Sequence, residues 1–111
     1  MGYRSEVLIA LTDKLCKDFL NSMKLDVAAE FIRCDGIHHK DGWTLFHYSD
    51  VKWYDGYKEV DAWTTFHKSI ADNCEDYEYH CMGEGSDDYT VDNHGCSPFN
   101  IYMNRSLDFE G

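Results

Sequence analysis

Positively charged side chains are scarce in the second part of this sequence. The 111 residues contain 10 Lys and Arg against 21 Asp and Glu, which gives a formal net charge of −11. No Lys or Arg occurs between Lys68 and Arg105. Because such a charge repels polyanions and attracts cationic surfaces, we expect no direct binding of nucleic acid and a partner protein with a basic surface. Solubility alone is the alternative reason for the acidity.

Several other features are rare or missing. There is no apolar run of about 18 residues, so we expect no membrane span. The first residues lack a small-residue cleavage site, which favours a strand over a signal peptide. The odd number of cysteines fits reduced thiols in a cytosol better than a disulfide framework: Cys16, Cys34, Cys74, Cys81 and Cys96.

Aromatic side chains are abundant, at 15% of the residues. Each buries a large apolar area, so a chain of this length can form one core without disulfides or metals. We find no linker, repeat or low-complexity segment. The sequence therefore predicts a single domain over residues 1–111.

Apolar periodicity predicts the first elements of structure. Residues 3–11 alternate between apolar and polar side chains, which indicates a strand with one buried face. Thr12 is a candidate N-cap for the helix that follows. Residues 25–36 predict a second short helix or a continuation of the first, with Asp26 as its N-cap and Gly36 at its end.

The remaining elements follow from turn signals and residue type. Asp41-Gly42 is the strongest signal in a predicted turn over 37–42. The later predictions are a strand over 43–54, a helix over 58–73, a strand over 77–82, a turn over 83–88, a short strand over 89–92 and a last strand over 99–109.

This order is typical of an α+β domain. We expect an antiparallel sheet of four to five strands with two or three helices on one face. The predicted order of elements favours the split-βαβ (ferredoxin-like) topology: strand, helix, strand, helix, strand, strand. The single proline, Pro98, precedes the last predicted strand, where its missing N–H disrupts no ladder.

Two clusters have metal-ligating side chains, and neither predicts a metal. The first has zinc-compatible donors in an unfamiliar spacing, two of them adjacent and so on opposite faces of a strand: His80, Cys81, His94 and Cys96. The second lacks the Ca²⁺-loop pattern and is by default a solvated turn: Glu84, Asp87, Asp88 and Asp92. We therefore expect no cofactor, no metal and no catalytic residue, because no nucleophile or phosphate-loop motif is present.

Few cations are available to balance the acidic region. Arg4 and Arg105 lie on the first and last predicted strands. One hypothesis is that they hold the turn around Glu84 and Asp87 by charge-assisted hydrogen bonds; two separate exposed arginines are the alternative. Together with Lys52, they are also the only obvious cationic groups that could bind the phosphate if the chain captures a small nucleotide.

Three segments resemble a family of small proteins encoded by bacteriophages and prophages. They are the opening "MGYRSEV", the central "DVKWY" at 50–54, and the late "GEGSDD" followed by "NRSLDF". The segments cover both ends and the middle of the chain. The resemblance implies a phage setting and the host cytoplasm as the place of action.

Charge and resemblance together predict a non-enzymatic inhibitor of a host factor, of the anti-CRISPR or anti-restriction type. Its acidic face would mimic nucleic acid, through Glu75, Asp76, Glu78, Glu84, Asp87, Asp88 and Asp92. Tyr77, Tyr79 and Tyr89 would supply apolar contacts. A sponge for a small nucleotide signal and a metal-dependent enzyme using the acidic turn are the alternatives. An exposed sheet edge could also support a homodimer.

Overall fold

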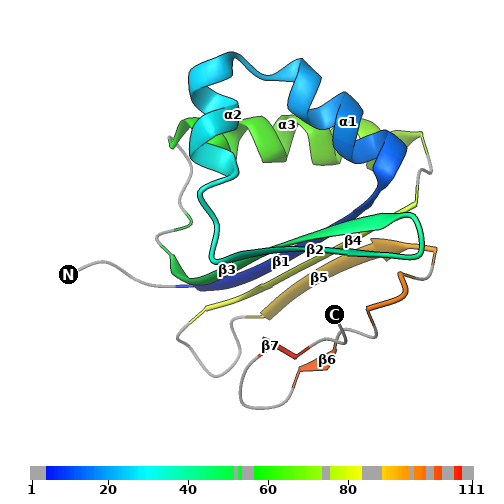
Figure 1. The fold of residues 1–111 in the computed structure, drawn as a ribbon. Helices are drawn as coiled ribbons and strands as arrows, with labels where there is room; N and C mark the ends of the chain where they lie inside the picture. Colours follow the sequence, from blue (N-terminus) through cyan, green and yellow to red (C-terminus); the bar gives the residue numbers. More distant parts are fainter. Residues whose placement is uncertain are drawn as a thin grey trace.

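Five antiparallel strands form an open sheet, and three helices cover one of its faces (Figure 1). The structure is a computed structural model that describes residues 5–51, 53, 57–73, 76–83, 89–95, 97–99, 102–103 and 107–108, without the side chains of 50, 51, 89, 102, 103, 107 and 108. The elements are β1 (Ser5–Thr12), α1 (Asp13–Ser22), α2 (Leu25–Phe31), β2 (Gly36–Lys40), β3 (Trp43–Val51), α3 (Lys58–Asp72), β4 (Tyr77–Met82), β5 (Tyr89–His94), β6 (Tyr102–Met103) and β7 (Leu107–Asp108).

The strand order of the sheet is β2-β3-β1-β4-β5. The prediction of an α+β fold with an antiparallel sheet and helices on one face is confirmed. The expected split-βαβ (ferredoxin-like) topology is not confirmed, because the sheet has five strands and its order differs from that plan, with the β4–β5 hairpin adding a strand at one edge. β1 is the central strand, paired with β3 on one side and with β4 on the other.

The helix boundaries confirm some of the predicted signals and correct others. Thr12 caps α1, its hydroxyl accepting a hydrogen bond from the Leu15 backbone N–H at 3.4 Å. Asp26 was expected to cap α2, but Lys24 occupies that position. Asp26 lies in the first turn, where a carboxylate still interacts favourably with the helix dipole. α2 ends at Phe31, and Gly36 begins β2 instead of ending the helix.

β2 replaces most of the turn predicted over 37–42. Only Asp41 and Gly42 form the turn, with φ of 50° and 82°. Such a two-residue loop with positive φ joins two strands directly, so the residues before it must pair with β3. The prediction was wrong for residues 37–40 because two histidines and a lysine conceal the alternation of an edge strand.

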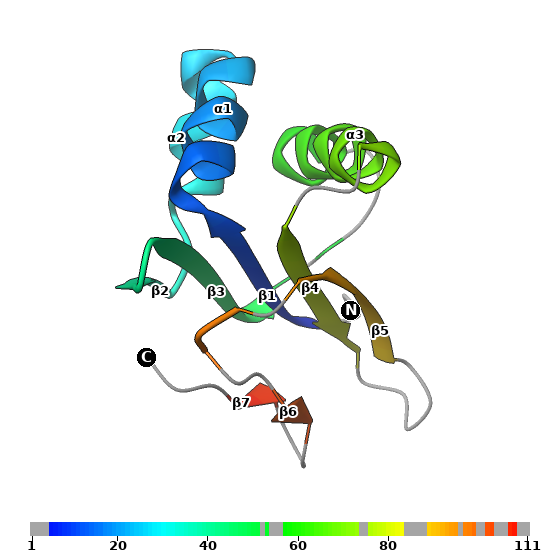
Figure 2. The same cartoon turned by 90° about the vertical axis from the view of Figure 1, so that its right-hand side faces the viewer.

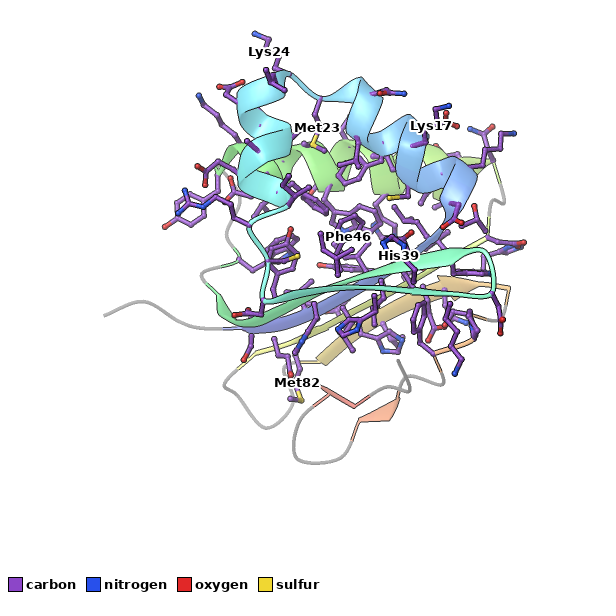
Figure 3. All side chains as sticks on the ribbon, viewed as in Figure 1. Lys17, Met23, Lys24, His39, Phe46 and Met82 are labelled. Atoms are coloured by element: carbon purple, nitrogen blue, oxygen red, sulfur yellow. The ribbon has the colours of Figure 1, made fainter. Side chains whose placement is uncertain are left out.

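Apolar cores lie on both faces of the sheet, so the prediction of one buried face for the first strand is wrong. On the helix-covered face, Phe46 packs with Phe19, Phe31 and Trp63 in the larger cluster. On the opposite face, a smaller cluster contains Leu8, Ala10, Leu45 and Phe99, with Trp43 and Met82 packed against it. Figure 3 shows Phe46 between the sheet and the helices and Met82 on the other side of the sheet.

The C-terminal segment forms the layer beneath this second face. The strand predicted over 99–109 is wrong: β6 and β7 are two short strands that pair with each other in a separate sheet. Figure 1 shows them on the side of the main sheet away from the helices. Phe99, with no exposed surface, anchors the start of this segment against Leu8, Ala10 and Leu45.

The helices form two groups above the sheet. Figure 2 shows α1 and α2 together on the side of β2 and β3, with α3 on the side of β4. α3 therefore lies next to the β4–β5 hairpin, which carries most of the acidic residues that the sequence singled out.

Candidate functional site

The predicted acidic site falls only partly within the described residues. Asp76 precedes β4, Glu78 lies on β4 and Asp92 on β5. Residues outside the described part are Arg4, Lys52, Glu75, Glu84, Asp87, Asp88, Cys96 and Arg105, and of Tyr89 only the backbone is described. The hypothesis that the two arginines hold the acidic turn therefore stays a prediction.

The described carboxylates do not form one face. In the β4–β5 register Tyr79 is opposite Asp92, whereas Glu78 is opposite Asn93. Successive side chains of a strand point to opposite faces, so Asp92 lies on the helix side and Glu78 on the side of the C-terminal segment. The expectation of a single acidic face is wrong for these two residues, and what they share is the β4–β5 hairpin.

Asp92 is the centre of a polar cluster between β5 and α3. The Tyr77 hydroxyl donates a hydrogen bond to Asp92 Oδ2 at 2.6 Å, and His67 Nε2 lies 2.6 Å from the same oxygen. The Tyr77 hydrogen bond, more than the one from His67, holds the pKa of Asp92 below its ordinary value. The carboxylate therefore stays charged at any ordinary pH.

Aromatic rings fix the orientation of His67. Its ring stacks on Trp63 with centroids 5.2 Å apart and an interplanar angle of 8°. Tyr77 meets it edge-on at 5.3 Å, and Tyr79 is tilted against it at 5.2 Å. Nothing in the sequence relates this histidine to a carboxylate on another element.

Glu78 and His80 form a second pair, beneath the C-terminal segment. His80 Nε2 lies 2.7 Å from Glu78 Oε2, and both side chains are almost fully buried. Burial alone would raise the pKa of Glu78, but hydrogen bonds to His80 and Ser97 outweigh it and leave the pKa lowered. His80 Nε2 is thus paired with a carboxylate instead of being placed to bind a metal ion.

Asp76 is the most exposed described carboxylate of the predicted site. It lies 3.6 Å from His94 Nδ1, with the side chains 58% and 51% exposed. An exposed pair of this kind contributes little to stability and leaves both groups open to a partner. Asp76, Glu78 and Asp92 are each paired with a histidine, and the sequence from 69 to 104 holds no Lys or Arg.

The predicted apolar contacts of Tyr77 and Tyr79 are wrong in their location. Tyr77 is buried, and Tyr79 is half-buried against the helix-side core. The Tyr79 hydroxyl accepts a hydrogen bond from Trp53 Nε1 at 3.1 Å. Both tyrosines therefore support the edge from beneath, and among the described side chains of β5 the exposed apolar one is Val91, at 49%.

Metal binding and thiol chemistry find little support in the described residues. Within that part of the chain no three His, Cys, Asp or Glu side chains are placed to hold a metal ion. Burial raises the pKa of the Cys16, Cys34 and Cys81 thiols, which makes them poor nucleophiles at neutral pH. None of the helices described has the length and apolar character needed for a membrane span.

A groove between the helix groups is a feature that the sequence reasoning missed. It has a volume of about 680 Å³ and lies between α3 and the junction of α1 with α2. Its apolar lining is Met23, Val27, Ala62 and Phe66. Its charged lining is Lys24, Lys58, Asp26 and Asp61, and Lys58 Nζ lies 3.5 Å from Asp26 Oδ2. Figure 3 shows Met23 pointing toward α3 and Lys24 pointing away from the helices. No sequence signal relates these helices in space.

Comparisons of the chain with protein-family models, with curated proteins and with solved structures found no match.

Proposed function

We propose that this chain is a phage-encoded, non-enzymatic binding protein that inhibits a host factor in the host cytoplasm. The contact surface is the edge of the sheet formed by β4 and β5, here called the acidic edge and defined by residues 72–94. The observation that carries this proposal is the absence of Lys and Arg from residues 69–104, the stretch that contains β4 and β5.

The described Lys and Arg side chains all lie outside β4 and β5. The described Lys and Arg side chains belong to the helices, to β2 and to the turn after α2: Lys14, Lys17, Lys24, Arg33, Lys40, Lys58 and Lys68. The sequence from 69 to 104 contains no Lys or Arg but has Asp72, Glu75, Asp76, Glu78, Glu84, Asp87, Asp88 and Asp92. Such an edge attracts basic protein surfaces and speeds their association.

The class of partner follows from this charge. Proteins that handle nucleic acid in host defence present basic grooves to the phosphate backbone. A narrow sheet edge with exposed carboxylates can occupy such a groove in place of nucleic acid, as an anti-CRISPR or anti-restriction protein would. Asp76 and Asp92 are the described side chains that remain accessible for this contact.

Affinity capture from a host lysate, with matched variants, tests the proposal. The edge variant E84Q/D87N/D88N removes three charges from the acidic edge, and D18N/E30Q/D41N removes three from α1, α2 and the β2–β3 turn. We expect the same protein to be captured by the wild type and the second variant and lost with the first. Equal capture by all three would contradict the role of the edge.

The groove between the helices supports a second candidate function, the capture of a small anionic ligand such as a nucleotide signal. Its volume of about 680 Å³ suits a small molecule, and Phe66 offers a ring for stacking. Lys24 and Lys58 are the cations of a lining that also holds Asp26 and Asp61, so an anion would compete with Asp26 for Lys58. A thermal-shift screen with cyclic dinucleotides, comparing the wild type with K24A/K58A, tests it. A shift in the wild type that the variant loses supports this function, and the absence of any shift contradicts it.

We also infer that strands β1 to β4 follow the split-βαβ plan, with β5 added to it. The supporting observation is that β3 lies between β1 and β2, and β1 lies between β3 and β4. An experimental structure with a different order of these four strands would contradict the inference.

A further inference from the structure

β5 is the less protected of the two edge strands. Native sheets usually blunt an edge with lysine, proline or a short strand. β2, at the other edge, has five residues and ends in Lys40. β5 has six residues, Tyr89–His94, and contains neither lysine nor proline. Among the described residues, no strand pairs with β5 on the side away from β4, so its backbone groups there are a template for one more strand.

The edge is also held rigid before any partner arrives. Asp92 joins β5 to α3 through His67 and to β4 through Tyr77. His67 is itself fixed by its stacking on Trp63, which is buried. A strand already held in its bound shape loses less conformational entropy on pairing, and this favours binding at β5.

Charge decides what kind of strand fits. A second copy paired through β5 would bring two segments together that each contain eight carboxylates and no Lys or Arg between residues 69 and 104. Like charges on paired strands are destabilising, so self-association at this edge is disfavoured. A cationic strand gains from the same field.

The two faces of β5 set the pattern of that strand. Thr90, Asp92 and His94 point to the helix side, where Asp92 is charged. Val91 and Asn93 point to the other side, where Val91 offers an exposed apolar side chain. An added strand that matches both faces alternates cationic residues with threonine or valine.

We infer that β5 binds an extended basic segment of the partner by strand addition, with main-chain hydrogen bonds along β5 and cationic side chains beside Asp92. This inference rests on the proposed function, because it specifies how the acidic edge meets a basic partner. Strand addition differs from the binding of a basic helix or a folded basic surface, because these would be attracted by charge but would form no main-chain hydrogen bonds with β5.

Two peptides of equal charge separate the inference from the proposed function. The first is a labelled Lys-Thr-Lys-Val-Lys-Thr-Lys peptide, and the second has the same sequence with N-methyl groups on its three central amides. Fluorescence anisotropy with the full chain at about 50 mM salt measures binding. We expect the methylated peptide to bind at least about tenfold more weakly, because it cannot form the ladder.

Equal binding of the two peptides would overturn strand addition and leave the electrostatic contact in place. Binding of neither would overturn both. The matched variants are V91K and I37K, which each add one lysine at an exposed apolar position, 49% and 42% exposed, on opposite edges of the sheet. We expect V91K to weaken binding of the first peptide about fivefold and I37K to leave it unchanged. Equal effects of the two variants would place the peptide away from β5.

Discussion

His67 Nε2 lies 2.6 Å from Asp92 Oδ2, and this contact joins the third helix to the outermost strand of the sheet. Tyr77 donates to the same oxygen from β4. One carboxylate therefore holds together three elements that are separate in the sequence. Because the Asp92 side chain is also 45% exposed, it both supports the edge strand and presents charge to a partner.

Asp92→Asn is expected to destabilise the protein by about 1 kcal/mol, at the low end for hydrogen bonds to a charged group because the side chain is partly exposed. Denaturant unfolding at pH 7 measures the change. Asp72→Asn, at the exposed C-terminal end of α3, removes the same charge and should leave stability equal or slightly higher, since a carboxylate is unfavourable there. An equal loss in both variants would mean that the contact with His67 and Tyr77 contributes nothing.

Acid should remove the contribution of Asp92. Its pKa in the folded protein is lowered, so its stabilisation is present above the pKa of the unfolded chain and is lost as the pH falls through the folded value. We expect the stability difference between the wild type and Asp92→Asn to be clear at about pH 5 and to shrink at about pH 3. Unfolding curves of both proteins at the two pH values give this difference, and a constant value would contradict the pKa shift.

Phe99→Ala should cost about 3–5 kcal/mol, because the ring is fully buried against the second face of the sheet. Loss of this anchor should also raise hydrogen exchange at the C-terminal segment before the sheet itself opens. Leu25→Ala, at a side chain that is 88% exposed, is the control and should change stability little. A small effect of Phe99→Ala would contradict the packing of this segment on the sheet.

Alkylation should be slow at three cysteines. Burial raises the thiol pKa of Cys16, Cys34 and Cys81, so little reactive thiolate exists at neutral pH. Iodoacetamide treatment followed by peptide mass spectrometry should label them more slowly than free glutathione. In denaturant the three should react at the rate of an ordinary thiol. Fast labelling of the native protein would contradict their burial.

Local patterns in the sequence predicted the elements well where a single signal dominated. Alternation over 3–11 and over 77–82 marked β1 and β4, and Thr12 marked the start of α1. β2 was missed because edge strands need no buried face and tolerate histidine and lysine. The separate β6–β7 sheet was missed because alternation predicts a strand but not the sheet to which it belongs.

The candidate site was predicted in composition but not in arrangement. The absence of Lys and Arg between Lys68 and Arg105 located the acidic edge, since charge is read directly from the sequence. The pairing of Asp92 with His67 joins residues that are 25 positions apart and depends on how α3 packs over the sheet. Tyr77 was predicted to be a surface contact, but it is buried. Alternation shows that the two faces of a strand differ, but it does not show which of them the helices cover.

The salt dependence of partner binding tests the central proposal most directly. The partner captured from the lysate is titrated with wild type, E84Q/D87N/D88N and D18N/E30Q/D41N at about 50 and about 300 mM salt. We predict that wild-type affinity falls steeply with salt, that the edge variant binds more weakly with a flatter dependence, and that the other variant keeps the wild-type slope. Equal affinities and slopes for all three proteins would contradict binding through the acidic edge.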